Sequence, residues 1–329
     1  MKALVYDAPE TLGFRDMPDP SPAPDEVLVR VDSVGICGSD MHAYLGHDDR
    51  RPAPLILGHE AAGVIVGGDR DGSRVTVNPL VTCGVCPACL AGRDNICPDR
   101  QIISMPPREG AFAQYLAIPE RNVVDVPDGI SLEAAALAEP IACGWHGVRL
   151  ALEVPRARDA APTALVLGGG AIGIGAALSL AAQGVTDVTI LEPNDVRRAY
   201  LGQSGHITLR EQDLDPDTMF DIVVDAVGLE GSRRTASARA RPGGVILHIG
   251  LGSAEGGLDI RRMTLQEITF IGTYTYTMAD FRATAAAMFD GRLGALDWSE
   301  IRDLGDGAAA FADIRSGRVE RPKIILKPN

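Results

Sequence analysis

A glycine-rich turn between an apolar segment and a helix of small residues constrains the fold of this chain more than any other stretch. Residues 164–167 are apolar, residues 168–173 form the pattern G-x-G-x-x-G, and small residues continue to Gly184. Such glycines permit a tight turn, admit a pyrophosphate at the helix N-terminus and allow close helix–strand packing. A second strand is predicted over 188–192. This stretch therefore predicts a dinucleotide-binding β–α–β unit.

An acidic residue at the end of the second strand indicates which dinucleotide would bind. Glu192 lies 24 residues after Gly168, close to the spacing of about 20 at which a carboxylate binds the ribose hydroxyls. Such a carboxylate repels a 2′-phosphate, which favours NAD over NADP. Arg197 and Arg198 weaken this preference, because a nearby arginine accommodates that phosphate, so NADP stays possible. The candidate cofactor-binding residues are Gly168, Gly170, Ala171, Ile172, Gly173, Glu192, Arg197 and, at the ends of two later predicted strands, Val227, Gly228, Ile249 and Gly250.

Strand and helix patterns continue to alternate after this unit. Further strands are predicted to begin at His206, Phe220, Val245 and Ile268. A helix is predicted over 232–240, and the R-P-G-G at 241–244 is predicted to be a turn. Six parallel strands with crossover helices make a doubly wound α/β sheet. Two helices and a K-I-I-L strand follow residue 276, and we expect this tail to rejoin an earlier domain.

The first 77 residues or so show the short alternating segments of an irregular β-rich domain, and residues 110–126 are predicted to form two further strands. Cys37, His59 and Glu60 lie within it and offer a thiolate, an imidazole and a carboxylate, a donor set that a catalytic zinc accepts when one coordination position stays open. A buried cysteine and a hydrogen-bonded histidine that never meet would leave the same pattern. We expect these residues on loops between strands, where functional groups often lie.

Three polar residues near this donor set are candidates for catalysis. Ser39 and His42 follow Cys37 by two and five residues, where a hydroxyl and an imidazole could carry a proton from a metal-bound oxygen towards solvent. Glu139 lies in a helical segment rich in alanine and leucine, with Ser131 as its predicted N-cap and a break expected at Pro140. Glu139 caps a neighbouring group, faces a cation or is an ordinary solvent-facing glutamate.

Four of the six cysteines form one compact cluster in the sequence. Cys83, Cys86, Cys89 and Cys97 can converge on one tetrahedral ion, and four thiolates leave no position open, which predicts a structural zinc. Chance clustering, a redox pair and an iron–sulfur cluster are the alternatives. The stretch has few large apolar residues and could hardly stay ordered without a crosslink.

Length and charge narrow the class of protein. A chain of 329 residues with 46% hydrophobic content has enough material for two cores. The net charge of −13 and the lack of a basic run argue against binding to nucleic acid. The N-terminus has no signal-peptide core, and no apolar run approaches the roughly 20 residues of a membrane span. We therefore expect a cytoplasmic protein without a membrane partner.

The G-H-E at 58–60, the four-cysteine stretch, the L-A-E-P at 137–140 and the G-G-G-A-I-G at 168–173 occur in the order typical of zinc-dependent medium-chain dehydrogenases/reductases. The chain resembles this family over essentially its whole length. The resemblance implies a GroES-like β-rich catalytic domain over 1–140, a Rossmann NAD-binding domain over 141–276 and a C-terminal return to the first domain over 277–329. It also implies a homodimer or homotetramer.

Residue by residue, the resemblance implies one catalytic and one structural zinc. Cys37, His59 and Glu60 match the catalytic ligands, and the four clustered cysteines match the structural site. Glu139 stands where alcohol dehydrogenases have a second cysteine ligand, which is similar to the sorbitol (polyol) dehydrogenase branch. It would hold the metal-bound water or exchange with Glu60 as ligand. Ser39 would accept the alcohol proton and pass it through the cofactor ribose to His42.

The implied reaction is hydride transfer from the carbinol carbon of a small secondary alcohol to C4 of the nicotinamide, with a polyol or sugar-like substrate. Two departures put polyol specificity in doubt. Ala43 stands where this branch commonly has tyrosine, with Tyr44 one place later, and Thr275 stands where arginine is common. The charged loop 46–51 either edges the substrate cleft or is a solvated surface loop. Threonine-, butanediol- or simple alcohol-type dehydrogenases are the alternatives among enzymes, and a nucleotide-binding protein without catalysis is the alternative outside them.

Overall fold

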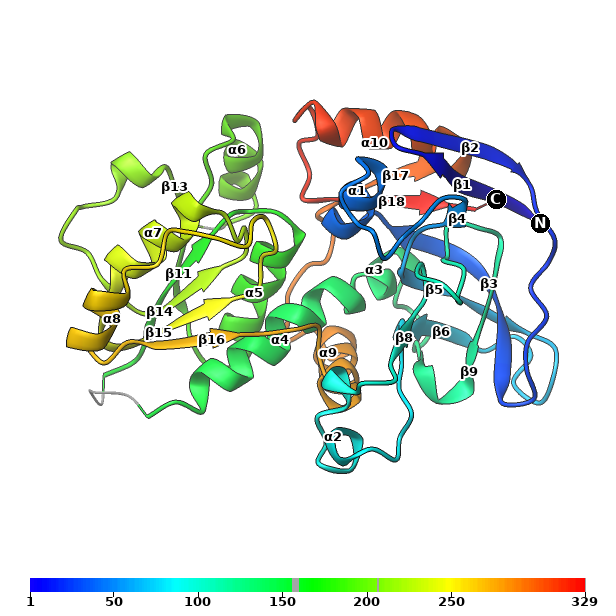
Figure 1. The fold of residues 1–329 in the computed structure, drawn as a ribbon, viewed down its shortest axis with the longest axis horizontal. Coiled ribbons are helices and arrows are strands. Elements are labelled where there is room, and N and C mark those ends of the chain that lie inside the picture. Colours follow the sequence, from blue (N-terminus) through cyan, green and yellow to red (C-terminus); the bar gives the residue numbers. More distant parts are fainter. Residues whose placement is uncertain (156–159, 206, 329) are drawn as a thin grey trace. The chain divides into compact units, whose positions relative to one another are not determined.

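The computed structural model describes residues 1–155, 160–205 and 207–328, and Figure 1 shows its ribbon. The chain forms two units. Unit 1 contains Met1–Glu139, Thr277–Gly291 and Ala295–Asn329. Unit 2 contains Pro140–Tyr276 and Arg292–Gly294.

Unit 1 is built mainly of antiparallel strands. Its largest sheet has the order β10-β6-β5-β3-β18-β17, and β9 also pairs with β3. Smaller sheets have the orders β2-β1-β4 and β7-β8. The strands are β1 (Lys2–Ala8), β2 (Thr11–Asp16), β3 (Glu26–Gly35), β4 (Leu55–Ile56), β5 (Glu60–Val66), β6 (Arg74–Val77), β7 (Leu80–Val81), β8 (Gln101–Ile102), β9 (Tyr115–Pro119), β10 (Val123–Asp125), β17 (Ser299–Asp303) and β18 (Lys323–Lys327). The C-terminal strands therefore complete a sheet that begins near the N-terminus.

The helices of unit 1 are short and lie between its strands. They are α1 (Gly38–Tyr44), α2 (Pro87–Leu90), α3 (Leu132–Ala136), α9 (Met278–Phe289) and α10 (Gly307–Arg315). The expectation that the metal candidates all lie on loops was wrong for Glu60, which is the first residue of β5. Cys37 is the N-cap of α1, and the catalytic candidates Ser39 and His42 are on that helix.

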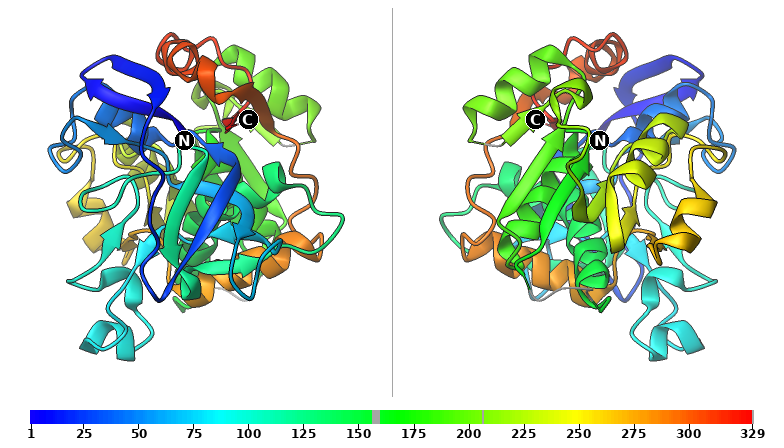
Figure 2. Two further views of the ribbon diagram at one scale, coloured as in Figure 1. Left: turned by 90° about the vertical axis from the view of Figure 1, so that its right-hand side faces the viewer. Right: turned by 90° about the vertical axis from the view of Figure 1, so that its left-hand side faces the viewer.

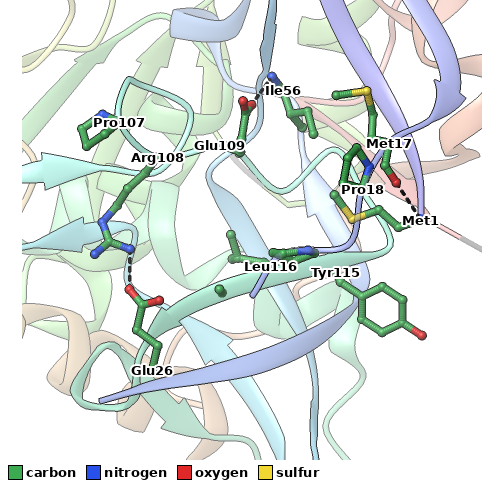
Figure 3. A pocket seen from close by; sticks show the side chains of 13 residues that line it. Met1, Met17, Pro18, Glu26, Ile56, Pro107, Arg108, Glu109, Tyr115 and Leu116 are labelled. Atoms are coloured by element: carbon green, nitrogen blue, oxygen red, sulfur yellow. Dashed lines mark hydrogen bonds and ion pairs between the residues drawn. The ribbon is translucent and has the colours of Figure 1, made fainter. Parts of the chain in front are cut away.

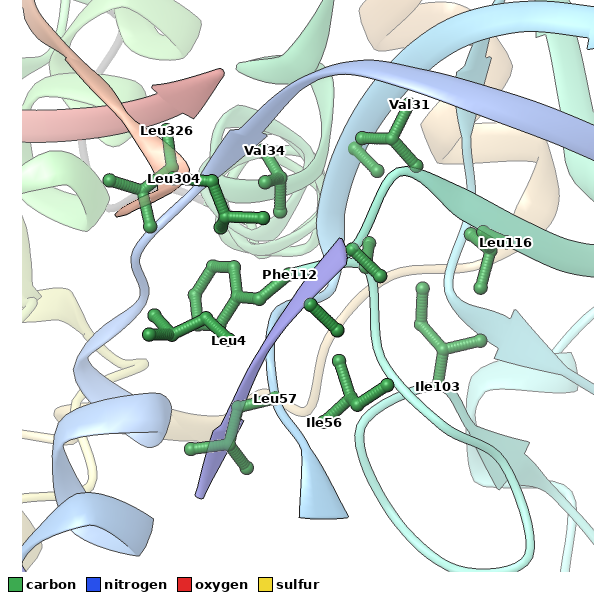
Figure 4. Close-up of a cluster of buried hydrophobic side chains, with 14 of the residues drawn as sticks. Leu4, Val31, Val34, Ile56, Leu57, Ile103, Phe112, Leu116, Leu304 and Leu326 are labelled. Carbon is green, nitrogen blue, oxygen red and sulfur yellow. The ribbon is translucent and has the colours of Figure 1, made fainter. Parts of the chain in front are cut away.

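The core of unit 1 joins the N-terminal strands to the C-terminal segment. Leu4 of β1, Val34 of β3 and Leu326 of β18 are each at most 1% exposed and belong to one cluster with Phe112. Figure 4 shows their side chains gathered together with Leu304. Burying this apolar surface stabilises the fold by about 25 cal/mol for each Å² removed from water. The position of β18 beside β3 thus depends on the core as well as on strand pairing.

The helix break expected at Pro140 was wrong by three residues. Helix α3 ends at Ala136, Leu137 lies between the helices, and α4 (Ala138–Leu152) begins at the next residue. Pro140 is therefore in the first turn of α4, where a backbone N–H has no acceptor within the helix, and a missing N–H costs little. Ser131 does cap α3, since its hydroxyl accepts a hydrogen bond from the N–H of Ala134 at 3.1 Å.

Unit 2 is a doubly wound parallel sheet, as predicted. Its strand order is β13-β12-β11-β14-β15-β16, and Figure 2 shows helices packed against these strands from two further sides. The strands are β11 (Thr163–Leu167), β12 (Asp187–Leu191), β13 (Ile207–Leu209), β14 (Phe220–Asp225), β15 (Ala240–His248) and β16 (Thr269–Gly272). Besides α4, the helices are α5 (Ala171–Ala182), α6 (Asp195–Gln203), α7 (Glu230–Arg239) and α8 (Ile260–Leu265). His206, predicted to start the third strand, lies outside the described residues.

The turn predicted for R-P-G-G was wrong, because residues 241–244 lie inside β15. Ala240 pairs with Phe220 and Val245 pairs with Ile222, so β15 has extra residues in this interval. Gly243 has a φ of +70°, which a glycine adopts without strain. The strand thus absorbs the turn-forming residues as a bulge instead of ending. Within the described part of the chain, no helix is long and apolar enough to cross a membrane.

Candidate active site

The structure brings Cys37, His59 and Glu60 together, although 22 residues separate the thiol from the imidazole in the sequence. One possible ligand atom from each lies within 4.8 Å of the others. Oε2 of Glu60 is buried and has no hydrogen-bond partner among the described residues. A buried carboxylate oxygen beside a thiol and an imidazole fits a divalent cation, which would satisfy it. The three residues therefore fit a zinc ion with a position left open.

Two glycines make room for this donor set. Gly58 has a φ of +89°, and a Cβ at this position would lie 2.5 Å from the ring of Phe112. A Cβ on Gly35 would lie 2.0 Å from Oε2 of Glu60. Larger residues at either position would displace the aromatic core or the carboxylate. Gly58 and Gly35 are thus required because neighbouring side chains lie where a Cβ atom would be.

Buried polar groups orient the imidazole of His59. Its Nδ1 lies 3.3 Å from the hydroxyl of Ser104 and 3.4 Å from Oδ1 of Asp40. Burial alone would lower the pKa of His59, but the negative charges of Asp40 and Cys37 raise it well above its usual value. With Nδ1 held by a carboxylate and a hydroxyl, Nε2 is the nitrogen left for a metal. Binding of the metal would displace a proton from this imidazole.

Ser39 lies at the metal-facing nitrogen of His59. Its hydroxyl is 3.4 Å from Nε2. His42 is three residues further along α1, on the same helical face as Ser39. The structure therefore places one of the two predicted proton carriers next to the donor set and the other one turn away.

Glu139 is not among the three residues whose possible ligand atoms lie within 4.8 Å of one another. It is 6% exposed, so the solvent-facing alternative is wrong. Its charge helps to raise the pKa of Lys323, a buried lysine that also contacts Glu60. The carboxylate of Glu139 thus interacts electrostatically with the ammonium group of Lys323.

The four-cysteine cluster also converges in unit 1. Possible ligand atoms of Cys83, Cys86, Cys89 and Cys97 all lie within 4.8 Å of one another. Hydrogen bonds from the N–H groups of Val85 and Cys86 lower the pKa of the Cys83 thiol to about 7, which favours the thiolate that a metal requires. Four converging sulfurs fit a zinc ion with no open position.

The lobe that carries these cysteines has little apolar support of its own. Val85 and Leu90 are 75% and 76% exposed. The carboxylate of Asp94 accepts a hydrogen bond from the N–H of Met278, the first residue of α9, at 3.0 Å. The lobe therefore contributes a hydrogen bond that holds the N-terminus of α9.

The glycine-rich turn in unit 2 has the geometry that a pyrophosphate needs. Gly168 has a φ of +92°, and a Cβ on Gly173 would lie 1.8 Å from the carbonyl oxygen of Gly168. A Cβ on Gly170 would meet nothing within 4 Å, which leaves open space at the N-terminus of α5. Ala171 and Ile172 form the first turn of this helix, which has no acidic residue there. These features fit an anion at the positive end of the helix.

The carboxylate of Glu192 lies beside this turn. Its two oxygens accept hydrogen bonds from the N–H groups of Gly169 at 2.9 Å and Asn194 at 2.7 Å. Arg197 lies 3.5 Å from the same carboxylate, while Arg198 donates to backbone carbonyls and to Asp195. Arg197, rather than Arg198, is therefore the arginine placed to affect a ribose phosphate.

The remaining cofactor candidates lie on two loops that touch each other. Val227 and Gly228 follow β14, and Ile249 and Gly250 follow β15. A Cβ on Gly228 would lie 2.2 Å from the carbonyl oxygen of Gly250. A Cβ on Gly168 would lie 2.6 Å from the side chain of Val227, so this pair of loops also borders the glycine-rich turn. All these candidates share the carboxyl edge of the parallel sheet, where dinucleotides bind.

The positions that differ from polyol dehydrogenases have distinct environments. Ala43 is buried, and the ring of Tyr44 packs on Phe311 with centroids 5.1 Å apart, so Tyr44 is a core residue. Thr275 has a φ of +47° and a buried hydroxyl without a partner among the described residues. Arg51 is 3% exposed and binds the carbonyl oxygen of Ser104, so at least this end of the charged loop is not solvated.

Sequence reasoning missed several residues that hold the site together. Asp40 carried a signal, because an aspartate three residues after an N-cap is typical of a capping box, and its carboxylate accepts from the N–H of Cys37 at 3.0 Å. Ser104 and Lys323 carried none, because their partners His59 and Glu60 are far away in the sequence.

A surface hollow of about 380 Å³ lies elsewhere on unit 1. Figure 3 shows its lining, which includes Met1, Met17 and the ion pair between Arg108 and Glu26. None of the candidate catalytic, metal or cofactor residues lines it. We therefore assign the chemistry to the donor clusters and not to this hollow.

Comparison with known proteins gives matches across both units. Residues 23–128 match the alcohol dehydrogenase GroES-like domain, and residues 171–290 match the zinc-binding dehydrogenase family. A sorbitol dehydrogenase of Bacillus subtilis is 36% identical over 84% of this chain and 82% of its own. An L-galactonate-5-dehydrogenase of Escherichia coli is 32% identical over 90% and 89%. A zinc-binding dehydrogenase of Sinorhizobium meliloti 1021, solved with NADP, has a TM-score of 0.87 at 25% identity over 99% of both chains.

Proposed function

The chain belongs to the zinc-binding alcohol dehydrogenases with a GroES-like domain, and from this premise we propose that it oxidises a secondary alcohol of a polyol or sugar-like molecule to the ketone, with NAD as hydride acceptor. The enzyme is an oxidoreductase that acts on small alcohols with zinc and NAD(P). The observation that carries the proposal is the open donor set of Cys37, His59 and Glu60, with one buried carboxylate oxygen left without a partner among the described residues.

We propose that two zinc ions have separate roles. At Cys37, His59 and Glu60, zinc would act as a Lewis acid that lowers the pKa of the substrate hydroxyl. The four cysteines would hold a second ion that only crosslinks the chain. Asp40 and Ser104 keep Nε2 of His59 aimed at the first site, and Ser39 accepts the alcohol proton there and passes it towards His42.

The substrate class is tested with initial rates of NADH formation on polyols, sugar acids, threonine and 2,3-butanediol, with NAD and NADP in parallel and a chelator control. We expect chelator-sensitive turnover of a polyol or sugar-like alcohol. Turnover confined to threonine or butanediol would support the second candidate. One observation favours that candidate. Polyol dehydrogenases commonly have a tyrosine at position 43 that contacts the substrate, whereas Tyr44 of this chain packs in the core and cannot make that contact.

The role of Ser39 is tested by its replacement with alanine. We expect a loss of about a hundredfold in kcat, because a positioned proton carrier contributes at least that much, together with a changed dependence of kcat on pH. Ser39→Thr keeps a hydroxyl and should retain most of the rate. An unchanged rate and pH profile in Ser39→Ala would rule out the relay.

The cofactor preference is tested by Glu192→Ala. We expect the ratio of NADP to NAD use to rise by about tenfold or more, because the like charge that opposes a 2′-phosphate is removed while Arg197 remains. Asp187→Ala is the matched control, since Asp187 is an exposed acidic residue at the start of β12, the strand that Glu192 follows. If the ratio did not change, the ribose role of Glu192 would be wrong.

We also propose a homodimer or homotetramer. Strand β16 ends the sheet and pairs only with β15 among the described strands. Phe270 on this strand is 38% exposed. An exposed strand edge with an aromatic side chain is a surface on which a second copy could pair.

A further inference from the structure

A buried lysine from the C-terminal strand lies against the proposed catalytic zinc ligands. Lys323 is the first residue of β18 and is 4% exposed. Its Nζ donates to Oε1 of Glu60 at 2.6 Å and to the carbonyl oxygen of Ile36 at 2.8 Å. A lysine is seldom buried unless it is paired, and the partner of Lys323 is the carboxylate of Glu60.

The strand register brings the two charges together. Gly35 of β3 pairs with Glu60 of β5 on one side and with Ile325 of β18 on the other. Because Gly35 has no Cβ, the carboxylate of Glu60 lies directly over its backbone. Lys323 reaches the carboxylate past the end of β3, where it also binds Ile36. The contact is therefore built into three neighbouring strands.

The charges around Lys323 explain why it stays protonated in a buried position. Burial alone would lower its pKa, but the negative charges of Glu60, Cys37 and Glu139 outweigh burial and raise it. Lys323 thus supplies a positive charge among three side chains that can carry a negative charge. A zinc ion at the same donors would share their negative charge with this lysine.

The two oxygens of Glu60 have different surroundings. Oε1 is held by Lys323, whereas Oε2 is buried without a hydrogen-bond partner among the described residues. Oε2 is therefore the oxygen with both lone pairs available to a metal, whereas one lone pair of Oε1 is taken by Lys323. A carboxylate that gave both oxygens would fill the position that a catalytic zinc keeps open for substrate.

We propose that Lys323 is a positioning residue that restricts Glu60 to one weakly donating oxygen and so keeps a coordination position open for the alcohol. This inference rests on the proposed function, since it requires zinc at Cys37, His59 and Glu60. Lys323 acts through Glu60 and does not itself touch the substrate.

The test is Lys323→Met, with zinc affinity measured by chelator competition on protein whose four-cysteine lobe remains loaded. Without the lysine, Glu60 is free to give both oxygens, so zinc should bind about tenfold more tightly while kcat/KM for the alcohol falls about tenfold to a hundredfold. A purely architectural lysine would give the opposite change in affinity, because loss of the ion pair would disorder the site and weaken zinc binding. Weaker zinc binding, or an unchanged kcat/KM, would overturn the proposal.

Lys327→Met is the matched control. Lys327 lies on the same strand and also forms ion pairs, with Asp32 and Glu133, but none with the donor set. It should leave both the zinc affinity and kcat/KM within about twofold of the parent enzyme, because its ion pairs do not involve the donor set and distant sites act independently.

A second comparison covers the case in which Lys323→Met fails to fold. Glu60→Gln and the double variant Glu60→Gln/Lys323→Met should differ little in zinc affinity, because the lysine acts only through the carboxylate. A tenfold difference between them would show that Lys323 acts on the metal directly and would overturn the proposal.

The parent enzyme separates this inference from the proposed function. If the parent held only the zinc of the four-cysteine lobe, or oxidised no alcohol, the proposed function would fail. If the parent bound the second zinc and oxidised alcohols while Lys323→Met lost affinity, only the role of Lys323 would be wrong.

Discussion

Replacing His59 with alanine is expected to lower kcat/KM for alcohol oxidation by about a thousandfold or more and to remove one zinc per chain. A Lewis acid supplies several kcal/mol of transition-state stabilisation, and each 1.36 kcal/mol or so is worth tenfold in rate. His59 is the only imidazole in the set, and its ring is held by Asp40 and Ser104. The donor set contains no second imidazole that could take over from His59 as ligand.

This variant should keep its affinity for NADH, because the cofactor candidates belong to unit 2. The measurements are initial rates, zinc content per chain and NADH fluorescence on binding. His47→Ala is the matched control, since His47 is exposed and does not belong to the donor cluster. It should keep both zinc ions and most of the rate. A His59→Ala enzyme with full zinc content and full rate would show that the reaction does not use this site.

Replacing Cys97 with serine is expected to remove the other zinc and to lower the thermal midpoint by about 10 °C, equal to about 3 kcal/mol for a domain of this size. Cys97 is 0% exposed, and its sulfur lies 3.5 Å from that of Cys83. The lobe exposes Val85 and Leu90, so it has few apolar contacts to hold it without the metal. Because metal binding is folding free energy in such small lobes, its loss should disorder the stretch.

Loss of order in the lobe should also release the contact between Asp94 and α9. Hydrogen exchange would then rise in residues 83–97 and at the start of α9, while the zinc at Cys37 and His59 stays bound. Cys143→Ser is the matched control, because Cys143 is a half-buried cysteine on α4 outside both clusters. It should retain both zinc ions and a midpoint within about 3 °C of the parent. A Cys97→Ser variant with the parent's zinc content and midpoint would contradict a structural metal.

Much of the fold and of the cofactor site could be predicted from short stretches of sequence. The six-stranded parallel sheet was predicted correctly because each strand and helix has its own local pattern, and parallel strands require crossovers. The glycines at 168, 170 and 173 constrain a single turn, so their spacing alone indicates the shape that they form. The four cysteines are close enough in the chain for their spacing to indicate one site.

Other features depended on context that local patterns do not contain. Pro140 suggested a helix break, but its effect depends on its distance from the start of α4, and that start is at Ala138. The R-P-G-G segment has turn-forming residues, but β14 pairs on both sides of it and keeps β15 continuous. In both cases tertiary structure decided between two outcomes of similar local free energy.

The sequence by itself determined the types of donor and their order along the chain, because motif spacing is a property of nearby residues. Only the tertiary structure decided how the donors are oriented and which charge balances them. Lys323 meets Glu60 across 263 residues, through the register of β18, β3 and β5 and a glycine that leaves space between them. Asp40 and Ser104 meet His59 from different elements. Such contacts depend on the packing of the whole core, and no local pattern of residues encodes that packing.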